Sequence, residues 1–194
     1  AYRAVGPVTD NNLLLSDVAM SSNGRYVVAA FGNNEMGGSG LYVVDDGNTD
    51  RVGRWSRMSP ISLDKFEERG VAISDDGKKL VVVGWGGENL RVAVKSDDSG
   101  ATWVPIEDSV NSQFVAASAD HQYIYIVKTT PEATLLISRD YGANWAKKEL
   151  NFTDEFYAFT SIVCSTDGAK VYLSSYDTYG RGYIYTSGDF AVSF

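Results

Sequence analysis

The chemistry that this chain could perform starts with its carboxylates. Hydrolysis of a glycosidic bond needs two carboxyl groups facing each other across a cleft, about 5–5.5 Å apart for retention and about 6.5–9.5 Å apart for inversion. The chain has 25 acidic residues. Those that fall in predicted loops are Asp64, Glu67, Glu88, Asp154 and Asp177. Because no spacing along the sequence selects a pair among them, a glycoside hydrolase is one hypothesis among several.

A second group of residues suits binding better than catalysis. Trp85 is followed by Gly86-Gly87, which would leave its ring uncovered. Tyr176 and Tyr179 precede Arg181, whose guanidinium can hold a carboxylate through two hydrogen bonds. Aromatic planes and polar groups together suit sugars and peptides. The predicted ligand-binding set is Trp85, Tyr176, Tyr179, Arg181, Asn33, Asn34 and Glu88.

Other site chemistries find no support in the sequence. The lone His121 occupies a turn position that Gly fills in related segments, so it is interpreted as a turn residue and not as a base. Asp75-Asp76-Gly77 and similar turns lack the Asp-x-Asp-x-Asp-Gly pattern and the distal Glu of a calcium loop. With no His/Cys cluster and no phosphate-binding Gly loop, we expect no metal and no cofactor.

Composition limits the partners. A net charge of −8 argues against nucleic acid or an anionic membrane, and no apolar run is long enough for membrane insertion as a helix. The single cysteine, Cys164, excludes an intrachain disulfide and lies in an apolar run typical of a small buried thiol. Asn151-Phe152-Thr153 is an N-glycosylation sequon in a predicted loop. Because residue 1 is Ala, we expect a processed or excised chain, or one that is part of a longer product.

The elements that position these residues are read from a repeat with a period in the forties. Segments 96–103 and 138–145 both read Ser-x-Asp-x-Gly-x-(Thr/Asn)-Trp, and a weaker copy begins at Ser187. In such a hairpin turn Asp accepts hydrogen bonds from turn amides, Gly takes a left-handed conformation, and Trp packs back. The residues predicted to be structural are Ser96, Asp98, Gly100, Trp103, Ser138, Asp140, Gly142 and Trp145.

A second motif precedes each of these boxes. Turns that begin at Ser21, Ser74, Ser118 and Ser165 separate two apolar runs, and Asn-Gly or Asp-Gly in that position is a strong hairpin signal. Each repeat then holds four strands, and such sheets must stack around an axis to bury their faces. We predict an all-β fold, a single β-propeller domain of four-stranded antiparallel blades spanning 1–194. The four repeats are approximately 9–61, 62–109, 110–151 and 152–194.

The ends of the chain leave three alternatives open. Residues 1–8 resemble the fourth strand of a repeat, and the last repeat stops where its own fourth strand should start. The N-terminal strand could complete the last blade and close a four-bladed ring. The chain could instead be cut from a longer array, or its first strand could complete a neighbouring subunit's blade.

This arrangement closely resembles the Asp-box (BNR-repeat) propellers, known from sialidases, certain glucan hydrolases, sortilin-type receptors and photosystem assembly factors. In that family the boxes lie at the periphery of the blades and carry no chemistry, which implies a structural role for Asp98, Asp140 and Asp189. The sialidase motif Phe/Tyr-Arg-Ile-Pro is absent, and Tyr2-Arg3-Ala4-Val5 is its nearest counterpart. An extracellular or secreted location is implied only by the habit of the family.

Strand order divides the connections between two ends of the sheets. The turns after the first and third strands share one end, and the longer loops share the other, where binding residues collect on a rigid scaffold. We therefore expect a non-catalytic binding or assembly module that recognises glycan or protein through the loop face. The alternatives are a glycoside hydrolase, or a fragment of one, and a structural subunit of an extracellular assembly joined by exchange of terminal strands.

Overall fold

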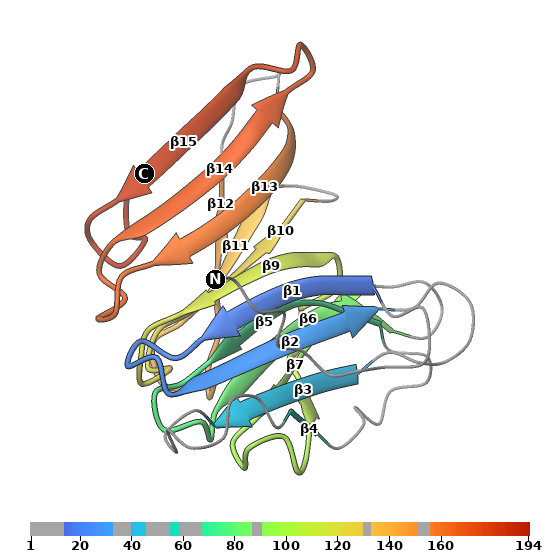
Figure 1. The fold of residues 1–194 in the computed structure, drawn as a ribbon. Coiled ribbons are helices and arrows are strands. Elements are labelled where there is room, and N and C mark those ends of the chain that lie inside the picture. The colour runs from blue at the N-terminus through green and yellow to red at the C-terminus, as the bar shows by residue number, and fades with distance from the viewer. Residues whose placement is uncertain are drawn as a thin grey trace, which may run out of the picture.

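Four antiparallel sheets follow one another along the chain in the computed structural model (Figure 1). The structure describes residues 14–32, 40–45, 55–58, 67–86, 91–129, 133–150 and 156–194, and these form strands and turns without a helix. The first sheet contains β1 (Leu14–Met20), β2 (Tyr26–Gly32), β3 (Gly40–Asp45) and β4 (Ser56–Arg57). The second contains β5 (Glu67–Ile73), β6 (Leu80–Trp85), β7 (Arg91–Ser96) and β8 (Val104–Pro105).

The third sheet contains β9 (Ser112–Ala117), β10 (Ile124–Lys128), β11 (Thr134–Ser138) and β12 (Ala146–Glu149). The fourth contains β13 (Phe156–Cys164), β14 (Val171–Asp177) and β15 (Gly182–Ser187). In every sheet the strands pair in sequence order, as expected for hairpin-linked blades. The last sheet has three strands in the described part of the chain, and the residues after β15 form a turn. Residues 1–8, which were predicted to complete this blade or a neighbouring one, lie outside the described residues.

Apolar cores lie between consecutive sheets. Val28 of β2 packs with Leu80 and Val82 of β6 in one cluster, Val83 of β6 packs with Ile126 of β10 in the next, and a third cluster joins the third and fourth sheets. Burying each such side chain stabilises the fold by about 1.5–3 kcal/mol. Because each cluster is shared by two sheets, consecutive sheets are more stable packed together than as separate hairpins.

The strands of inner and outer sheets differ in burial pattern. In β6 the first five residues are all buried, because the second sheet has a neighbour on both faces. In β14 burial alternates, with buried Val171 and Leu173 on one face and exposed Tyr172 on the other. The fourth sheet is therefore covered on one face only in the described part of the chain.

The turns between the first two strands of each sheet share one hydrogen-bond pattern. In the second sheet Ser74 Oγ donates to Asp76 Oδ1 at 2.7 Å and accepts from Lys79 N at 2.9 Å. Three residues after each turn serine the backbone is left-handed, at Gly24, Gly77, His121 and Gly168, with φ of 74°, 72°, 62° and 76°. Glycine adopts this conformation without steric cost, and His121 is the exception among the four.

The turns between the third and fourth strands have a second pattern, which we call the Ser-x-Asp turn. In segment 96–103, Ser96 Oγ accepts from Gly100 N at 2.9 Å, and Asp98 Oδ1 accepts from Thr102 N at 2.8 Å. The same bonds recur in segments 138–145 and 187–194. Trp103 and Trp145 each pack against the core of the preceding sheet boundary. These residues are thus used in building the fold.

Consecutive sheets pack through their innermost strands. β1 and β2 pack on β5, β5 and β6 on β9, and β9 and β10 on β13. No strand of the first sheet packs comparably on the fourth within the described ranges. The four innermost strands therefore surround a common axis, and the first and fourth sheets are the two ends of the series (Figure 1).

Candidate functional site

A cavity of about 440 Å³ follows the axis between the four innermost strands. Its lining changes character from one end to the other. Near the longer loops it is polar, with Ser16, Asp17, Arg69, Thr160 and Ser161. Near the turns it is largely apolar, with Met20, Ile73, Ala117 and Cys164 among its residues. We call these parts the loop end and the turn end of the axial cavity.

A β-bulge interrupts each of the four innermost strands at the same place. The residues left out of register are Ser16, Arg69, Gln113 and Thr160. Each lies five positions before the turn serine of its sheet (16 to 21, 69 to 74, 113 to 118, 160 to 165). A bulge redirects side chains and is common beside binding sites. The repetition concentrates polar groups at the loop end of the axial cavity.

Asp17 is the one acidic residue among those that line this cavity in the described part of the chain. Its Oδ2 accepts from Val71 N at 3.0 Å and its Oδ1 from Val18 N at 2.9 Å. Burial raises the pKa of Asp17, and these two hydrogen bonds oppose the rise. The Asp17 carboxylate thus links β1 to β5 through backbone amides. Because both of its oxygens already accept hydrogen bonds, we interpret Asp17 as a structural residue.

Cations gather beside the loop end. Arg69 is exposed and lines the axial cavity. Arg91 lies directly across from Trp85 in the second sheet, with its guanidinium carbon 4.6 Å from the centroid of the Trp85 ring. Arg91 Nε is buried without a hydrogen-bond partner. Burial lowers the pKa of Arg91, and the charge of Arg69 lowers it further. The two guanidinium groups therefore repel each other, and of the two only Arg69 lines the cavity.

The predicted ligand residues in the fourth sheet form a self-contained loop. Arg181 Nε donates to Asp177 Oδ2 at 2.5 Å, and its guanidinium carbon lies 5.1 Å from the Tyr179 ring centroid. Burial raises the pKa of Asp177, but hydrogen bonds from Arg181, Tyr183 and Tyr179 outweigh it and bring the pKa to about 2. Arg181 thus already binds a carboxylate of its own chain. Tyr176 is half-buried on the neighbouring strand, β14.

The expectation for Trp85 needs correction. Its ring is half-buried and stacked by Arg91 instead of uncovered, because the cross-strand register places the two side chains opposite each other. Asn33, Asn34, Glu88 and the sequon residue Asn151 lie outside the described residues. The structure therefore brings together Trp85, Arg91 and Arg69, and sets apart Tyr176, Tyr179 and Arg181 on another sheet.

Sequence reasoning missed the bulge positions and Arg91. Aligning the four turn serines puts Ser16, Arg69, Gln113 and Thr160 in one column, each next to an otherwise apolar run. That column was the available signal. Arg91 carried no such signal, because its partner Trp85 comes from the other side of a loop, and only strand register joins them.

The turn end of the molecule has a second cavity, of about 420 Å³, bordered by Asp75, Asp76, Asp120, Lys79 and Tyr141 among others. Its acids are already hydrogen-bonded. Asp75 accepts from Ser22 Oγ and Asn23 N, and Asp76 and Asp120 accept from the turn hydroxyl and a backbone amide. No cluster of three metal-ligating side chains occurs among the described residues.

Two titratable groups at the turns are unsuited to catalysis. Burial lowers the pKa of His121 to about 4, and its Nε2 has no partner. Cys164 was expected to be buried but is half-buried, since it lines the axial cavity. Burial still raises the pKa of its thiol to about 12, so the nucleophilic thiolate is scarce at neutral pH.

No protein-family model and no curated protein matches the chain. Solved structures match its fold. TolB from Acinetobacter baumannii aligns at a TM-score of 0.64 and 14% identity, covering 94% of this chain and 42% of that one. Hydrazine synthase from Kuenenia stuttgartiensis aligns at 0.57 and 14%, covering 91% and 58%. A putative TolB from Agrobacterium tumefaciens aligns at 0.57 and 17%, covering 83% and 54%.

These similarities establish the fold class. The chain is an all-β protein whose four antiparallel sheets are arranged as in β-propellers. It spans less than two thirds of the length of each of the three structures. No helix long and apolar enough to cross a membrane occurs in the described ranges.

Proposed function

We propose that this chain is a non-catalytic binding module that holds an acidic group of a glycan or peptide at the loop end of the axial cavity. The observation that carries the proposal is the electrostatic interaction of two guanidinium groups, one of which lines that cavity. Arg69 stands at a bulge in the cavity wall, and Arg91 is stacked on Trp85 with a buried Nε that has no partner. An anion there would accept a hydrogen bond from Arg91 Nε and would be attracted by the charge of Arg69.

The charge balance supports a carboxylate as the recognised group. On a chain of net charge −8, a local pair of cations is a minority feature, and it attracts anions to that one place. The planar guanidinium holds a carboxylate with two parallel hydrogen bonds. A volume of about 440 Å³ suits a monosaccharide or a short peptide end, since ligand pockets are commonly about 300–1,000 Å³.

Binding is favoured over hydrolysis by the state of the acids. Among the described cavity residues the only carboxylate is Asp17, and both of its oxygens accept backbone hydrogen bonds. Asp177 is tied to Arg181. The remaining candidate acids, Asp64, Glu67, Glu88 and Asp154, have side chains outside the described part. A facing pair of the kind that glycoside hydrolysis needs is therefore not among the described side chains.

We also assign the Ser-x-Asp turns to the Asp-box type. The assignment is supported by three copies with the same bonds, in which amides of the turn donate to the serine Oγ and to the aspartate carboxylate. It agrees with a structural role for Ser96, Asp98, Ser138 and Asp140, as the family resemblance implies. An extracellular location stays a prediction.

The test is a binding screen with matched pairs of ligands, each acidic glycan or peptide beside its neutral amide or alcohol. We expect acidic members to bind, and Arg69→Gln or Arg91→Gln to weaken binding by about tenfold or more, because hydrogen bonds to charged groups contribute roughly 1.5–3 kcal/mol. Arg25→Gln is the control, since Arg25 lies exposed at the turn end, paired with Asp45. Equal binding of neutral ligands, or equal loss with the control, contradicts the proposal.

A further inference from the structure

Main-chain hydrogen bonds link the turns of successive sheets in one direction. Asp75 N donates to Ala119 O, and Ala119 N donates to Thr166 O, both at 2.8 Å. At the first boundary Asn23 Nδ2 takes the donor's place and bonds Asp75 O at 3.0 Å. Each acceptor residue follows its turn serine by one position (74 to 75, 118 to 119, 165 to 166). The series thus runs from the first sheet to the fourth.

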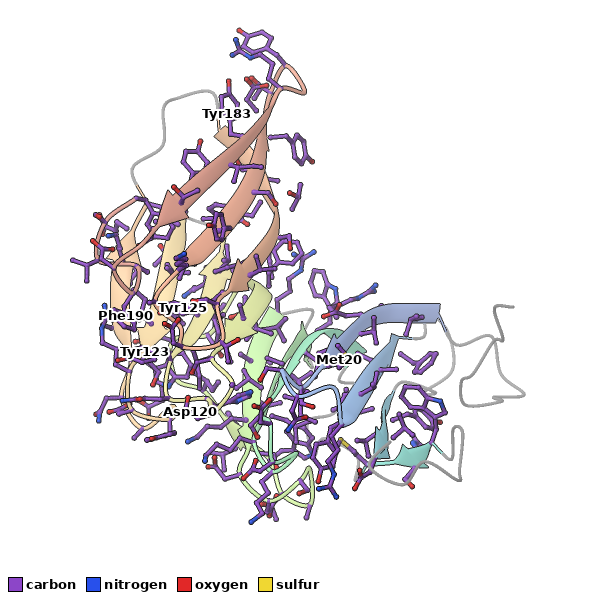
Figure 2. All side chains as sticks on the ribbon, turned by 60° about the vertical axis from the view of Figure 1, so that its left-hand side comes forward. Met20, Asp120, Tyr123, Tyr125, Tyr183 and Phe190 are labelled. Atoms are coloured by element: carbon purple, nitrogen blue, oxygen red, sulfur yellow. The ribbon has the colours of Figure 1, made fainter. Side chains whose placement is uncertain are left out.

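At the first and third boundaries a side chain of the earlier sheet covers the turn of the later sheet. The Tyr26 ring of the first sheet lies so close to Gly77 of the second that a Cβ there would be 2.9 Å from it. The Tyr123 ring of the third sheet covers Gly168 of the fourth in the same way, at 2.9 Å. It also packs against Phe190 of the fourth sheet with ring centroids 4.6 Å apart (Figure 2). A large residue of one sheet therefore sits on a glycine of the next.

The first and fourth sheets each have one side of this boundary contact without the other side, within the described residues. Within the described residues no acceptor bonds Thr166 N and no donor bonds Ser22 O. Gly24, the counterpart of Gly77 and Gly168, has no atom within 4 Å of the place where a Cβ would stand. Lys170 occupies the position of Tyr26 and Tyr123, five after its turn serine (165 to 170), and is exposed. The fourth sheet thus ends in a donor half and the first in an acceptor half.

The outer faces of the two end sheets have exposed apolar side chains. On the first sheet Leu15, Val18 and Met20 are exposed by 58%, 57% and 63%, and strand register places them on the face away from the second sheet. On the fourth sheet Val163, Tyr172 and Ile184 are exposed by 55%, 44% and 73%, on the face away from the third. Such faces usually mark an interface. Figure 2 shows Met20 on one of the two end sheets.

We propose that these two faces bind each other between copies of this chain, the fourth sheet of one copy packing on the first sheet of the next. The contact continues the hydrogen bond between turns that occurs at all three internal boundaries and the side-chain contact over glycine that occurs at two of them. Thr166 N is directed to Ser22 O, and Lys170 lies over Gly24. A head-to-tail contact of this kind closes into a ring or extends as a chain. It also gives the axial cavity the wall that it lacks between Val18 and Val163, which line it from opposite ends of the series.

The test is the molar mass in solution, without ligand, so that its outcome is independent of the proposed binding function. We expect a mass of at least twice 21.1 kDa for the chain and a monomer for either Met20→Glu or Ile184→Glu alone. The control is Val104→Glu, which places the same charge at a valine that is 55% exposed on β8 and leaves association intact. Circular dichroism and thermal melting check that the three variants fold alike.

Mixing the two monomeric variants tests the head-to-tail geometry. The Met20→Glu chain retains an intact fourth sheet and the Ile184→Glu chain an intact first sheet, so an equimolar mixture regains a two-chain complex. If either variant still associates by itself, like faces pair and the proposal is wrong. Deleting residues 1–8 tests the alternative mechanism, exchange of the N-terminal strand between copies. If this deletion abolishes association and the two face variants do not, strand exchange is indicated and the proposal is wrong. A monomeric parent chain overturns it as well.

Discussion

The turn end and the loop end of this molecule use polar residues in opposite ways. At the turn end the serines and aspartates are hydrogen-bonded within their own turns or, for Ser22 and Asp75, between two turns. The pKa of Asp98 falls to about 2 because Thr102 and Ser96 donate to it. At the loop end Arg91 has a buried Nε without a partner and lies near a second cation, Arg69. Both ends have a buried nitrogen without a hydrogen-bond partner, but that of His121 at the turn end belongs to a neutral ring and that of Arg91 at the loop end belongs to a cation.

The difference separates structural residues from binding candidates. A polar group with all its hydrogen bonds made inside the fold contributes to stability and gains nothing from a ligand. A group whose charge is destabilised by burial and by a like charge gains from any anion that reaches it. Counting acids by loop position would have chosen Asp177, whereas the satisfied bonds of Asp177 and the unsatisfied Nε of Arg91 reverse that choice.

The largest expected effect is a loss of folding stability in acid, caused by His121 at the turn end. His121 has a pKa of about 4 in the fold against 6.5 as its ordinary value, so between these pH values only the unfolded chain binds the proton. Stability is then complete above pH 6.5 and is lost as the pH falls toward 4, by about 3 kcal/mol. Urea unfolding at pH 7 and pH 4.5 measures this loss.

The matched variant for this prediction is His121→Gly, the residue that the other three turns have at that position. We expect it to flatten the dependence of the unfolding free energy on pH between 7 and 4.5. If the unfolding free energy of this variant depends on pH as in the parent chain, groups other than His121 cause the acid sensitivity. The prediction for the turn end is then wrong.

A second prediction compares an internal sheet boundary with an open end. Gly168→Ala and Gly24→Ala impose the same left-handed strain, at φ of 76° and 74°, but only Gly168 has a tyrosine ring in the way. We expect about 1 kcal/mol of destabilisation at Gly24 and about 2 kcal/mol more at Gly168 from overpacking. Chemical denaturation at low protein concentration gives both values, and equal losses would mean that the Tyr123 contact is easily relaxed.

The smallest effect compares a hydroxyl at each end. Ser138 Oγ is fully buried and accepts from Gly142 N at 2.8 Å, so Ser138→Ala leaves a buried amide unpaired and costs about 1.5 kcal/mol. Thr160 at the loop end is exposed and bonds the Ser174 hydroxyl, so Thr160→Val changes stability by less than about 0.5 kcal/mol. Thermal melting of both variants provides the comparison, which fails if the two losses are alike.

Much of the local structure was predictable from the repeat. The turn serines mark hairpins in all four sheets, and the offsets from them locate the strands that follow. His121 was expected to be a turn residue and adopts the left-handed turn conformation. The contacts of the predicted binding residues were harder to predict from the sequence. Trp85 contacts Arg91 only because the strand register places them opposite each other, while Tyr179 and Arg181 interact within their own loop, where Arg181 binds Asp177.

The sequence by itself determined what is local and periodic: strands of a given length, turns with Ser, Asp and Gly at set offsets, and the need of apolar sheets to stack. These follow from short-range hydrogen bonding and from hydrophobic alternation, which are written into neighbouring residues. Only the tertiary structure decided which charges are satisfied and which are not. Whether Asp177 meets Arg181 or a ligand, and whether Arg91 is desolvated beside Arg69, depends on packing between strands distant in sequence.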